Sequence, residues 1–209
     1  MPLLKLDLHV HTIASYDGHT KAEDLPRIIR SRGLDGVAVT EHDRFNPPKL
    51  TDALILPAVE ISSCDGHIIA LGIHEIIPSR LPADETLEKI HEQRAVAIIP
   101  HPYDPVCECV KIPRLKVKPD AVETINADAV SFHVSNWLAR RDAHKFKLHQ
   151  VGGSDSHIPQ TIGDAYTIVD SSSRDLHDIL DAIRMGRVRP EGRPTSITNK
   201  LRKLSYKLA

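Results

Sequence analysis

The sequence Leu3-Leu-Lys-Leu-Asp-Leu-His-Val-His11 decides the fold, because a short apolar run ends here in two histidines. Residues 3–9 have the composition of a buried strand. Side chains alternate along a strand with period two, so histidines separated by one residue point to the same side. Two imidazoles on one side can hold a single metal ion. The rest of the chain decides whether other ligands meet this strand end.

Seven further segments are also short, rich in apolar residues and bounded by turn residues. They cover residues 36–40, 54–61, 68–73, 96–100, 121–125, 150–153 and 165–169. Helices are predicted between several of them, over residues 25–32, 84–94, 135–149 and 174–185. The capping-box pattern Thr20-Lys-Ala-Glu23 precedes the first helix and Gly33 follows it, while Gly186 follows the last.

The alternation of strands and helices predicts a parallel sheet that is covered on both faces or closed into a barrel. At about 30 residues per βα unit, the 209 residues have room for about seven units. We therefore predict an α/β fold of the distorted (β/α)7 barrel type. An open doubly wound sheet is the alternative, although no Gly-x-Gly-x-x-Gly or P-loop motif follows any strand.

The composition indicates one domain over residues 1–209, with residues 187–209 as a basic C-terminal extension. A net charge of -1 provides no overall field toward nucleic acid or membrane. No apolar run approaches the roughly 20 residues of a membrane-spanning helix, and the N-terminus lacks a signal-peptide core. Cys64, Cys107 and Cys109 are an odd number, which argues against a secreted disulfide framework. We expect a cytoplasmic protein without a membrane partner.

More histidines and carboxylates fall at or just beyond the predicted strand ends. His42, His101 and His157 follow the second, fifth and seventh strands. The carboxylates at these ends and their flanks are Asp7, Asp17, Glu41, Asp43, Glu60 and Asp155. The C-terminal ends of parallel barrel strands open on one face, so residues far apart in sequence meet there. One strand-end histidine is usually a packing residue, but the whole set predicts a metal site.

Imidazole and carboxylate groups together suit Mn²⁺, Zn²⁺ or Fe ions better than Mg²⁺. The set is larger than one tetrahedral ion can use. We therefore expect two or three divalent ions that share bridging carboxylates.

Seven short motifs carry a resemblance to a known family. They are Asp7-Leu-His9-Val-His11, Ser15-Tyr-Asp17-Gly18, Thr40-Glu-His42-Asp43, Val59-Glu60-Ile61, Gly66-His67, His101-Pro102 and Gly153-Ser-Asp155-Ser-His157. The series resembles that of the PHP family, named for polymerases and histidinol phosphatases, and runs in order from residue 7 to about residue 167. The resemblance implies a distorted (β/α)7 barrel with two or three metal ions that hydrolyses phosphoesters.

The resemblance also implies three sets of metal ligands, of which the first two share one carboxylate. The first set holds one ion and consists of His9, His11, Glu60 and Asp155. The second set shares the bridging carboxylate of Glu60 and adds His67 and His101. The third set consists of Asp17, His42 and His157.

One position departs from the family pattern and another leaves it open. The motif at residues 40–43 usually begins Thr-Asp-His in the family, whereas this chain has Glu41 in place of the aspartate. This exchange could reorient neighbouring groups without removing the ligand His42. His74 lies seven residues beyond His67 on the same apolar run, and odd spacing places the two on opposite faces of a straight strand. Both cannot serve, and we predict His67.

The implied activity is a metal-dependent phosphoesterase acting on a small metabolite, a nucleotide or an oligonucleotide end. Neighbouring ions can hold a bridging hydroxide and neutralise the charge of phosphoryl transfer. Asp155 or a metal-bound histidine such as His101 could pass a proton to the leaving oxygen. Two alternatives stay open: an amidohydrolase-like enzyme that hydrolyses a C–N or C–O bond, and a barrel scaffold without catalysis.

A substrate phosphate also needs cations from the protein. Arg44, two residues after His42, and Lys111, in the loop beyond His101, would lie near the mouth of such a barrel. Glu123 and Asn126 end another strand on the same face. They either line the pocket, as similar residues do in PHP proteins, or cap a loop.

The basic extension carries seven lysines and arginines against Glu191 alone. Leu201, Leu204 and Leu208 recur at three- and four-residue spacing, which predicts a short amphipathic helix. Three roles are open for it. Its leucines dock on the barrel, which we favour, or it pairs with a second subunit in an oligomer, or it brings phosphate-rich substrate to the site.

Overall fold

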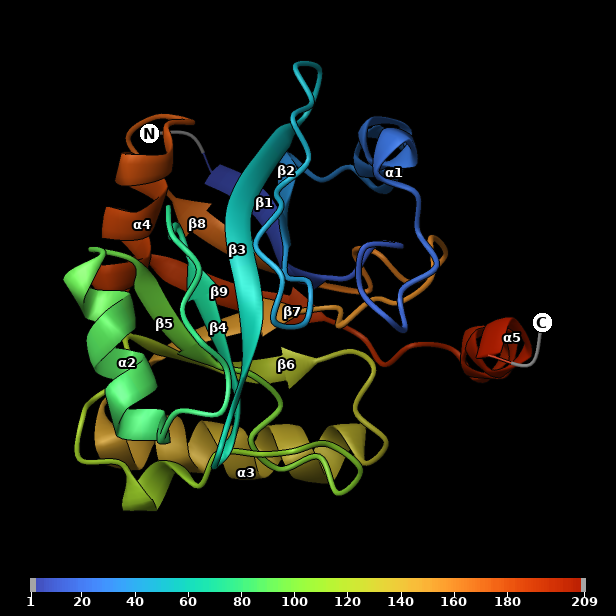
Figure 1. Ribbon diagram of the computed structural model, residues 1–209. Coiled ribbons are helices and arrows are strands. Elements are labelled where there is room, and N and C mark those ends of the chain that lie inside the picture. The colour runs from blue at the N-terminus through green and yellow to red at the C-terminus, as the bar shows by residue number, and fades with distance from the viewer. Residues whose placement is uncertain (1–2, 208–209) are drawn as a thin grey trace.

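A computed structural model describes residues 3–207 of the chain (Figure 1). Its strands are β1 (Leu3–Val10), β2 (Gly36–Val39), β3 (Leu54–Ser63), β4 (Gly66–Leu71), β5 (Val96–Ile99), β6 (Ala121–Asn126), β7 (His149–Gly153), β8 (Ala165–Asp170) and β9 (Val188–Gly192). Its α-helices are α1 (Leu25–Arg32), α2 (Ala83–Glu92), α3 (Phe132–Phe146), α4 (Leu176–Arg184) and α5 (Ile197–Lys207). Short 3-10 helices cover Ala22–Asp24 and Ile112–Arg114.

The described strands form one sheet in the order β7-β6-β5-β4-β3-β2-β1-β8-β9. From β1 to β7 neighbouring strands are parallel, except that β4 runs antiparallel to both β3 and β5. The sheet curls until the segment after β7 meets β1, where Ser156 bridges Val10 and donates its N–H to the carbonyl of His9 at 3.3 Å. The predicted α/β fold, a barrel-like sheet, is therefore confirmed.

A regular series of seven βα units is not confirmed. Among residues 3–207, α-helices join β1 to β2, β4 to β5, β6 to β7 and β8 to β9, whereas the other connections lack one. The strands β8 and β9, which α4 connects, extend the sheet beyond β1 in antiparallel pairing. Residues 188–192 form β9, so the segment assigned to a basic extension begins inside the sheet.

The start of α1 differs from its prediction. A 3-10 turn precedes the helix, no side chain caps its first turn, and Pro26 lies in that turn instead. The capping-box prediction is therefore wrong at this end. Gly33 ends the helix as expected, because its φ of 63° is a left-handed conformation that glycine adopts without steric cost.

The barrel interior is apolar at one end and polar at the other. Along β3, Leu56 faces the apolar core and Glu60, four residues on, shares its face at the strand's far end. β4 runs the other way, so Leu71 joins the apolar core while His67 reaches the polar end. Because β4 is antiparallel, His67 near its beginning lies at the polar end of the barrel, which is the mouth. Helix α4 covers the apolar end with Ile179, Leu180 and Ile183.

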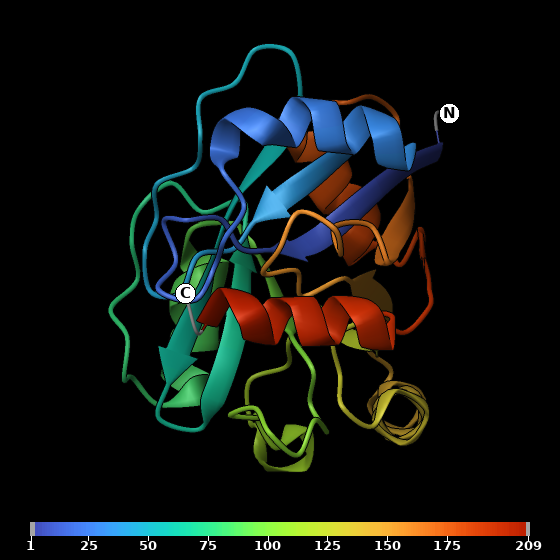
Figure 2. The same ribbon diagram turned by 90° about the vertical axis from the view of Figure 1, so that its right-hand side faces the viewer.

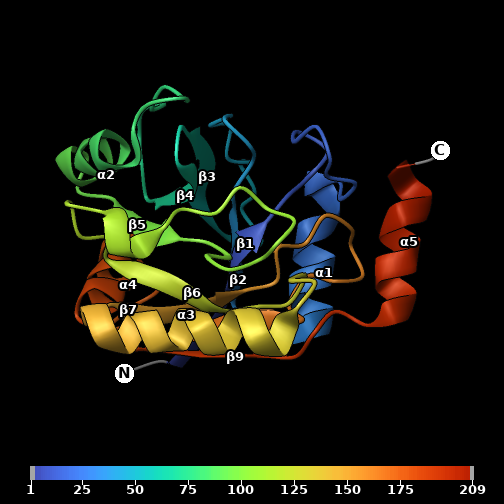
Figure 3. The same cartoon turned by 90° about the horizontal axis from the view of Figure 1, so that it is seen from below.

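Helices cover the outside of the sheet, with α1 on β1 and β2 and α2 on β4 and β5. Helix α5 instead stands apart from the other helices (Figures 1 and 3). Its Leu201 and Leu204 are 61% and 56% exposed, so the prediction that these leucines dock on the barrel is wrong. Leu208, the third leucine of the predicted pattern, lies outside the described residues. No helix of residues 3–207 has the length and apolar character needed to cross a membrane.

Candidate metal centre

The residues predicted as metal ligands lie together at the polar end of the barrel. They come from β1 and the loop after it, from the ends of β2, β5 and β7, and from facing positions of β3 and β4. Their nitrogens and oxygens form four overlapping groups, each with atoms within 4.8 Å of one another. The complete set is His9, His11, Asp17, His42, Glu60, His67, His101, Asp155 and His157.

Glu60 lies at the centre of this set and is buried. Ring nitrogens of five histidines lie 3.0–3.4 Å from its two carboxylate oxygens: His9, His11, His42, His67 and His101. One oxygen faces His67 and His101, while the other faces the remaining three. A carboxylate in this position can bridge two ions.

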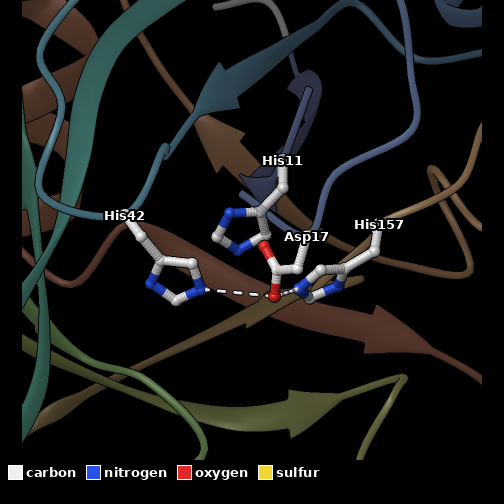
Figure 4. A group of neighbouring side chains, drawn as sticks. All are labelled: His11, Asp17, His42 and His157. Carbon is white, nitrogen blue, oxygen red and sulfur yellow. Dashed lines mark ion pairs between the residues drawn. The ribbon is translucent and has the colours of Figure 1, made fainter. Parts of the chain in front are cut away.

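A second carboxylate, Asp17, lies between two imidazoles (Figure 4). Its Oδ2 is 3.0 Å from Nε2 of His157 and 3.7 Å from Nε2 of His42, and His11 completes the group. A third, Asp155, places its Oδ1 3.5 Å and 3.6 Å from the Nε2 atoms of His9 and His11. The mouth therefore combines carboxylates and imidazoles from six different strands and the loops that follow them.

Several of these buried polar atoms have no hydrogen-bond partner within the described chain. They are Nε2 of His11, Oδ1 of Asp17, Nδ1 of His42 and Nδ1 of His67. Buried polar groups are nearly always hydrogen-bonded, because an unsatisfied one costs about 1–3 kcal/mol. Nitrogen and oxygen donors that face one another in this way are the donors that Zn²⁺ and Mn²⁺ take. The residues present therefore fit a cluster of divalent ions.

The electrostatics of the mouth favour bound positive charge. Burial raises the pKa of Glu60, but the charge of His9 and the hydrogen bond from His101 outweigh it and hold that pKa well below its usual range. Burial lowers the pKa of His11, yet Asp155 and Glu60 raise it to about 9. Because an imidazole must lose its proton to bind a metal, ion binding here releases protons and weakens as the pH falls.

Glu123 and Asn126, on β6, support the ligands from behind. Glu123 accepts the backbone N–H of His101 at 3.0 Å, and its other oxygen lies 3.3 Å from Nδ1 of His9. Asn126 donates from Nδ2 to Glu123 at 2.7 Å and to Asp155 at 3.2 Å. Such outer contacts fix the orientation of metal ligands.

Two ligand positions have left-handed backbone. The φ angles of His101 and Asp155 are 30° and 53°, in a region that residues other than glycine rarely adopt. Each costs on the order of 1–3 kcal/mol and persists only where the surroundings hold it. Both residues follow a strand directly, so the turn aims their side chains back into the barrel mouth.

Glu41 stabilises the loop after β1. It is buried, burial raises its pKa, and it accepts the backbone N–H and the hydroxyl of Thr12. The longer carboxylate that departs from the family motif thus reaches the residue next to His11, without joining the ligand groups of the described chain.

Three predicted or considered residues lie elsewhere. His74 is exposed, and its backbone N–H donates to the side chain of Gln93, so His67 is the one that reaches the mouth. Arg44 is exposed and does not line the cavity at the mouth. Lys111 lines a separate hollow beside Asp65 and Asp84.

The mouth opens into a cavity of ≈ 320 Å³ whose lining includes residues that the sequence analysis missed. They are Tyr16, Asp104, Cys107, Asp128 and Lys203. Tyr16 stands inside a quoted motif, next to Asp17, so its position was available as a signal. Lys203 belongs to α5, whose approach to the mouth depends on the whole fold and leaves no local pattern.

Comparisons with known proteins agree with this architecture. A family model described as PHP-associated matches residues 133–188. The uncharacterized protein MJ1587 of Methanocaldococcus jannaschii is 32% identical over 141 residues, which are 59% of this chain and 82% of the relative.

Solved structures share the fold at low sequence identity. A two-domain protein of Bacteroides vulgatus, described as containing a predicted PHP-like metal-dependent phosphoesterase, has a TM-score of 0.69 and 19% identity over 99% of this chain and 70% of its own. PsfC of Pseudomonas syringae has a TM-score of 0.74 and 15% identity, and the match covers 100% of this chain and 99% of PsfC. Endonuclease Q, in complex with a 27-mer duplex carrying an abasic lesion, has a TM-score of 0.65 and 13% identity. This match covers 88% of this chain and 57% of the endonuclease chain.

The fold and the site define a class of α/β proteins. In this class, a barrel-like sheet carries histidines and carboxylates at its mouth whose nitrogen and oxygen atoms can serve as metal ligands. The family model falls on α3 to β9, and the archaeal relative is covered over most of its length. The chain belongs to the PHP family.

Proposed function

We propose that this chain is a metal-dependent phosphoesterase, with two or three Mn, Zn or Fe ions as its cofactors. Its substrate is the phosphate ester of a small metabolite, a nucleotide or an oligonucleotide end. The observation that carries the proposal is the position of Glu60, whose two oxygens face five imidazoles at the barrel mouth.

Two of the three ligand sets share Glu60. His9, His11, Glu60 and Asp155 would hold one ion, Glu60 would hold a second with His67 and His101, and Asp17, His42 and His157 would hold a third. Bound ions would lower the pKa of a water molecule toward neutrality and offset the negative charge of the phosphate. His101 directs its Nε2 at Glu60 from 3.0 Å, a position from which this nitrogen would hold the second ion together with Glu60.

Asp155 would take the proton of the attacking water and pass it to the leaving oxygen of the substrate. Burial raises its pKa, but the charge of His9 and the nearby imidazoles of His11 and His157 hold that pKa well below its usual range, so the carboxylate is ionised. Asn126 fixes its Oδ2 at 3.2 Å. His157 places Nδ1 2.9 Å from the carbonyl of Asp155 and Nε2 3.0 Å from Oδ2 of Asp17.

Hydrolysis assays test this function. Chelator-treated protein is reloaded with Mn²⁺, Zn²⁺ or Mg²⁺ and offered aryl phosphates, sugar phosphates, mononucleotides and 5′-phosphorylated oligonucleotides beside amides and lactones. We expect phosphate esters alone to be hydrolysed, and His9→Ala and Asp155→Ala to abolish turnover and reduce bound metal. Full activity of the metal-stripped protein, or turnover confined to amides or lactones, would refute the proposal.

A further inference from the structure

We propose that Lys203 on α5 binds the phosphate group of the substrate, and that α5 caps the mouth so that the site takes a terminal phosphomonoester and not an internal diester of a duplex. This inference rests on the proposed phosphoesterase function. It adds a substrate-binding residue that lies outside the PHP motif series.

Helix α5 lies across the side of the molecule that Figure 2 shows, and its Lys203 lines the same cavity as the metal-site residues. A short arm after β9 carries it there, away from α4 and the apolar end of the barrel (Figure 1). The helix begins with Ile197, which is exposed, and has no apolar contact with the core clusters of the described chain. Hydrophobic packing therefore does not explain its position.

Polar contacts hold α5 in place. Nζ of Lys200 donates to the backbone carbonyls of Asp128 and Ala129 at 3.0 Å and 3.1 Å. One turn later, Nζ of Lys203 lies 2.6 Å from Oδ2 of Asp128. Near the end of the helix, the ring of Tyr206 stacks on His19 with centroids 4.9 Å apart. The polar face of α5 thus points toward the mouth, whereas Leu201 and Leu204 are exposed.

Lys203 reaches the metal-site residues themselves. Its Nζ lies 3.1 Å from Nδ1 of His157, and its side chain is 18% exposed although its neighbours on the helix are open to solvent. Confining a lysine in this way costs side-chain entropy and hydration, which a single ion pair with Asp128 offsets poorly. A phosphate oxygen delivered to the same place would be a second partner for the ammonium group.

The charge of the cavity makes Lys203 distinctive. Six carboxylates line it: Asp17, Glu60, Asp104, Glu108, Asp128 and Asp155. Among the described residues of the lining, Lys203 is the single lysine or arginine. A phosphate dianion entering this cavity meets strong repulsion except at the metal ligands and at this ammonium group. Lys203 therefore supplies the cation that phosphate recognition needs beyond bound ions.

The size of the site fixes the class of substrate. A cavity of ≈ 320 Å³ is at the small end of ligand pockets and admits a phosphate with part of its alcohol group. An internal phosphate of a duplex would have to carry both flanking nucleotides and the second strand past α5. A terminal phosphate enters alone, whether it belongs to a metabolite, a mononucleotide or a single-stranded end.

A charge-removal series on α5 tests the role of Lys203. Lys203→Met removes the charge and keeps most of the stem, Lys203→Arg restores a cation, and Arg202→Met makes the same exchange at an exposed neighbour. The affinity of each metal-loaded protein for inorganic phosphate is measured by calorimetry. KM and kcat are then measured for p-nitrophenyl phosphate, a sugar phosphate, a mononucleotide and a 5′-phosphorylated oligonucleotide, with bis-p-nitrophenyl phosphate and a nicked duplex as diesters.

We expect Lys203→Met to weaken phosphate binding and raise KM roughly 10- to 100-fold, the loss for one charge-assisted hydrogen bond, with a smaller change in kcat. Lys203→Arg recovers much of the loss, and Arg202→Met changes both values less than about twofold. Terminal monoesters are turned over faster than either diester. The order of kcat/KM among the terminal monoesters shows whether the phosphate belongs to a metabolite, a mononucleotide or an oligonucleotide end.

Three results would overturn the inference: unchanged phosphate affinity in Lys203→Met, no phosphate binding by the metal-loaded wild type, or preferred turnover of the duplex diester. A loss of thermal stability and metal content in Lys203→Met with intact phosphate affinity would assign the residue a structural role instead. Calorimetry does not depend on turnover. Phosphate binding that needs Lys203 without hydrolysis of any phosphate ester would therefore refute the phosphoesterase function alone.

Discussion

Replacing Gly153 by alanine tests how closely β7 must approach β1 beside the metal ligands. A Cβ at this position would lie 2.6 Å from Oε1 of Glu123 and 2.6 Å from Cβ of His9. The backbone of Gly153 is not left-handed, so alanine adds steric overlap without torsional strain. The overlap is about 0.8 Å relative to the 3.4 Å at which ordinary contact begins, and such overpacking costs roughly 1–3 kcal/mol.

For a chain of this length, that cost lowers the unfolding temperature by roughly 2–12 °C. The displaced groups are a ligand and the carboxylate behind it, so metal affinity should fall about 10- to 100-fold. Thermal unfolding in chelator measures the first effect, and metal titration at fixed pH measures the second.

Gly152→Ala is the matched control, one residue earlier on β7. Its Cβ would lie 3.0 Å from the carbonyl oxygen of Tyr166, away from the site. We expect a smaller loss of stability and unchanged metal affinity. If Gly153→Ala unfolds at the wild-type temperature and binds metal with wild-type affinity, then contact between β1 and β7 does not position the ligands.

Three further predictions concern single side chains. Glu60→Gln should lose at least one equivalent of bound metal by elemental analysis, and its hydrolysis rate should fall at least about 100-fold, since the carboxylate charge of Glu60 faces several imidazoles at once. Retained metal would contradict the bridging position of Glu60. His67→Ala should weaken metal binding roughly 10- to 100-fold while His74→Ala changes nothing, and the reverse pattern would refute the placement of β4. Asp120→Asn tests pH dependence: burial raises the pKa of Asp120, but the hydrogen bond with His91 outweighs it and lowers that pKa. The stabilisation is therefore present above the unfolded pKa of about 4 and lost as the pH falls through the lowered folded pKa, so the destabilisation by Asp120→Asn in urea unfolding should be clear near pH 6 and shrink steadily as the pH falls below about 4.

The strands were predictable because their signal is local. Each predicted strand overlaps a strand of the structure, since short apolar runs bounded by turn residues leave few other choices. The strand β9 was missed because Val188-Arg-Pro-Glu-Gly192 is mostly polar and pairs only with β8 at the edge of the sheet. Such an edge strand needs one partner, and its sequence carries no apolar run.

The gathering of the site residues was also predictable, because it follows from where parallel strands end. The choice of His67 over His74 needed the direction of β4, which apolar content does not encode. The phosphate-binding role predicted for Arg44 stays a prediction, and the residue is exposed outside the cavity.

The orientation of α5 was the principal error about the C-terminal segment. Its leucine spacing correctly predicted an amphipathic helix. The periodicity does not say which face meets the barrel, and here the lysine face does, because carbonyls and a carboxylate at the mouth attract it. An amphipathic pattern therefore predicts a helix more safely than it predicts the helix's contact surface.

The most direct test of the central claim is a crystal structure of the protein grown with Mn²⁺ or Zn²⁺, with anomalous difference maps recorded at the metal edge. We predict at least two peaks at the barrel mouth, one of them on each side of the Glu60 carboxylate, about 2.0–2.2 Å from its oxygens and from the facing imidazole nitrogens. A metal-saturated crystal without anomalous density between these side chains would contradict the claim that they form a shared metal centre.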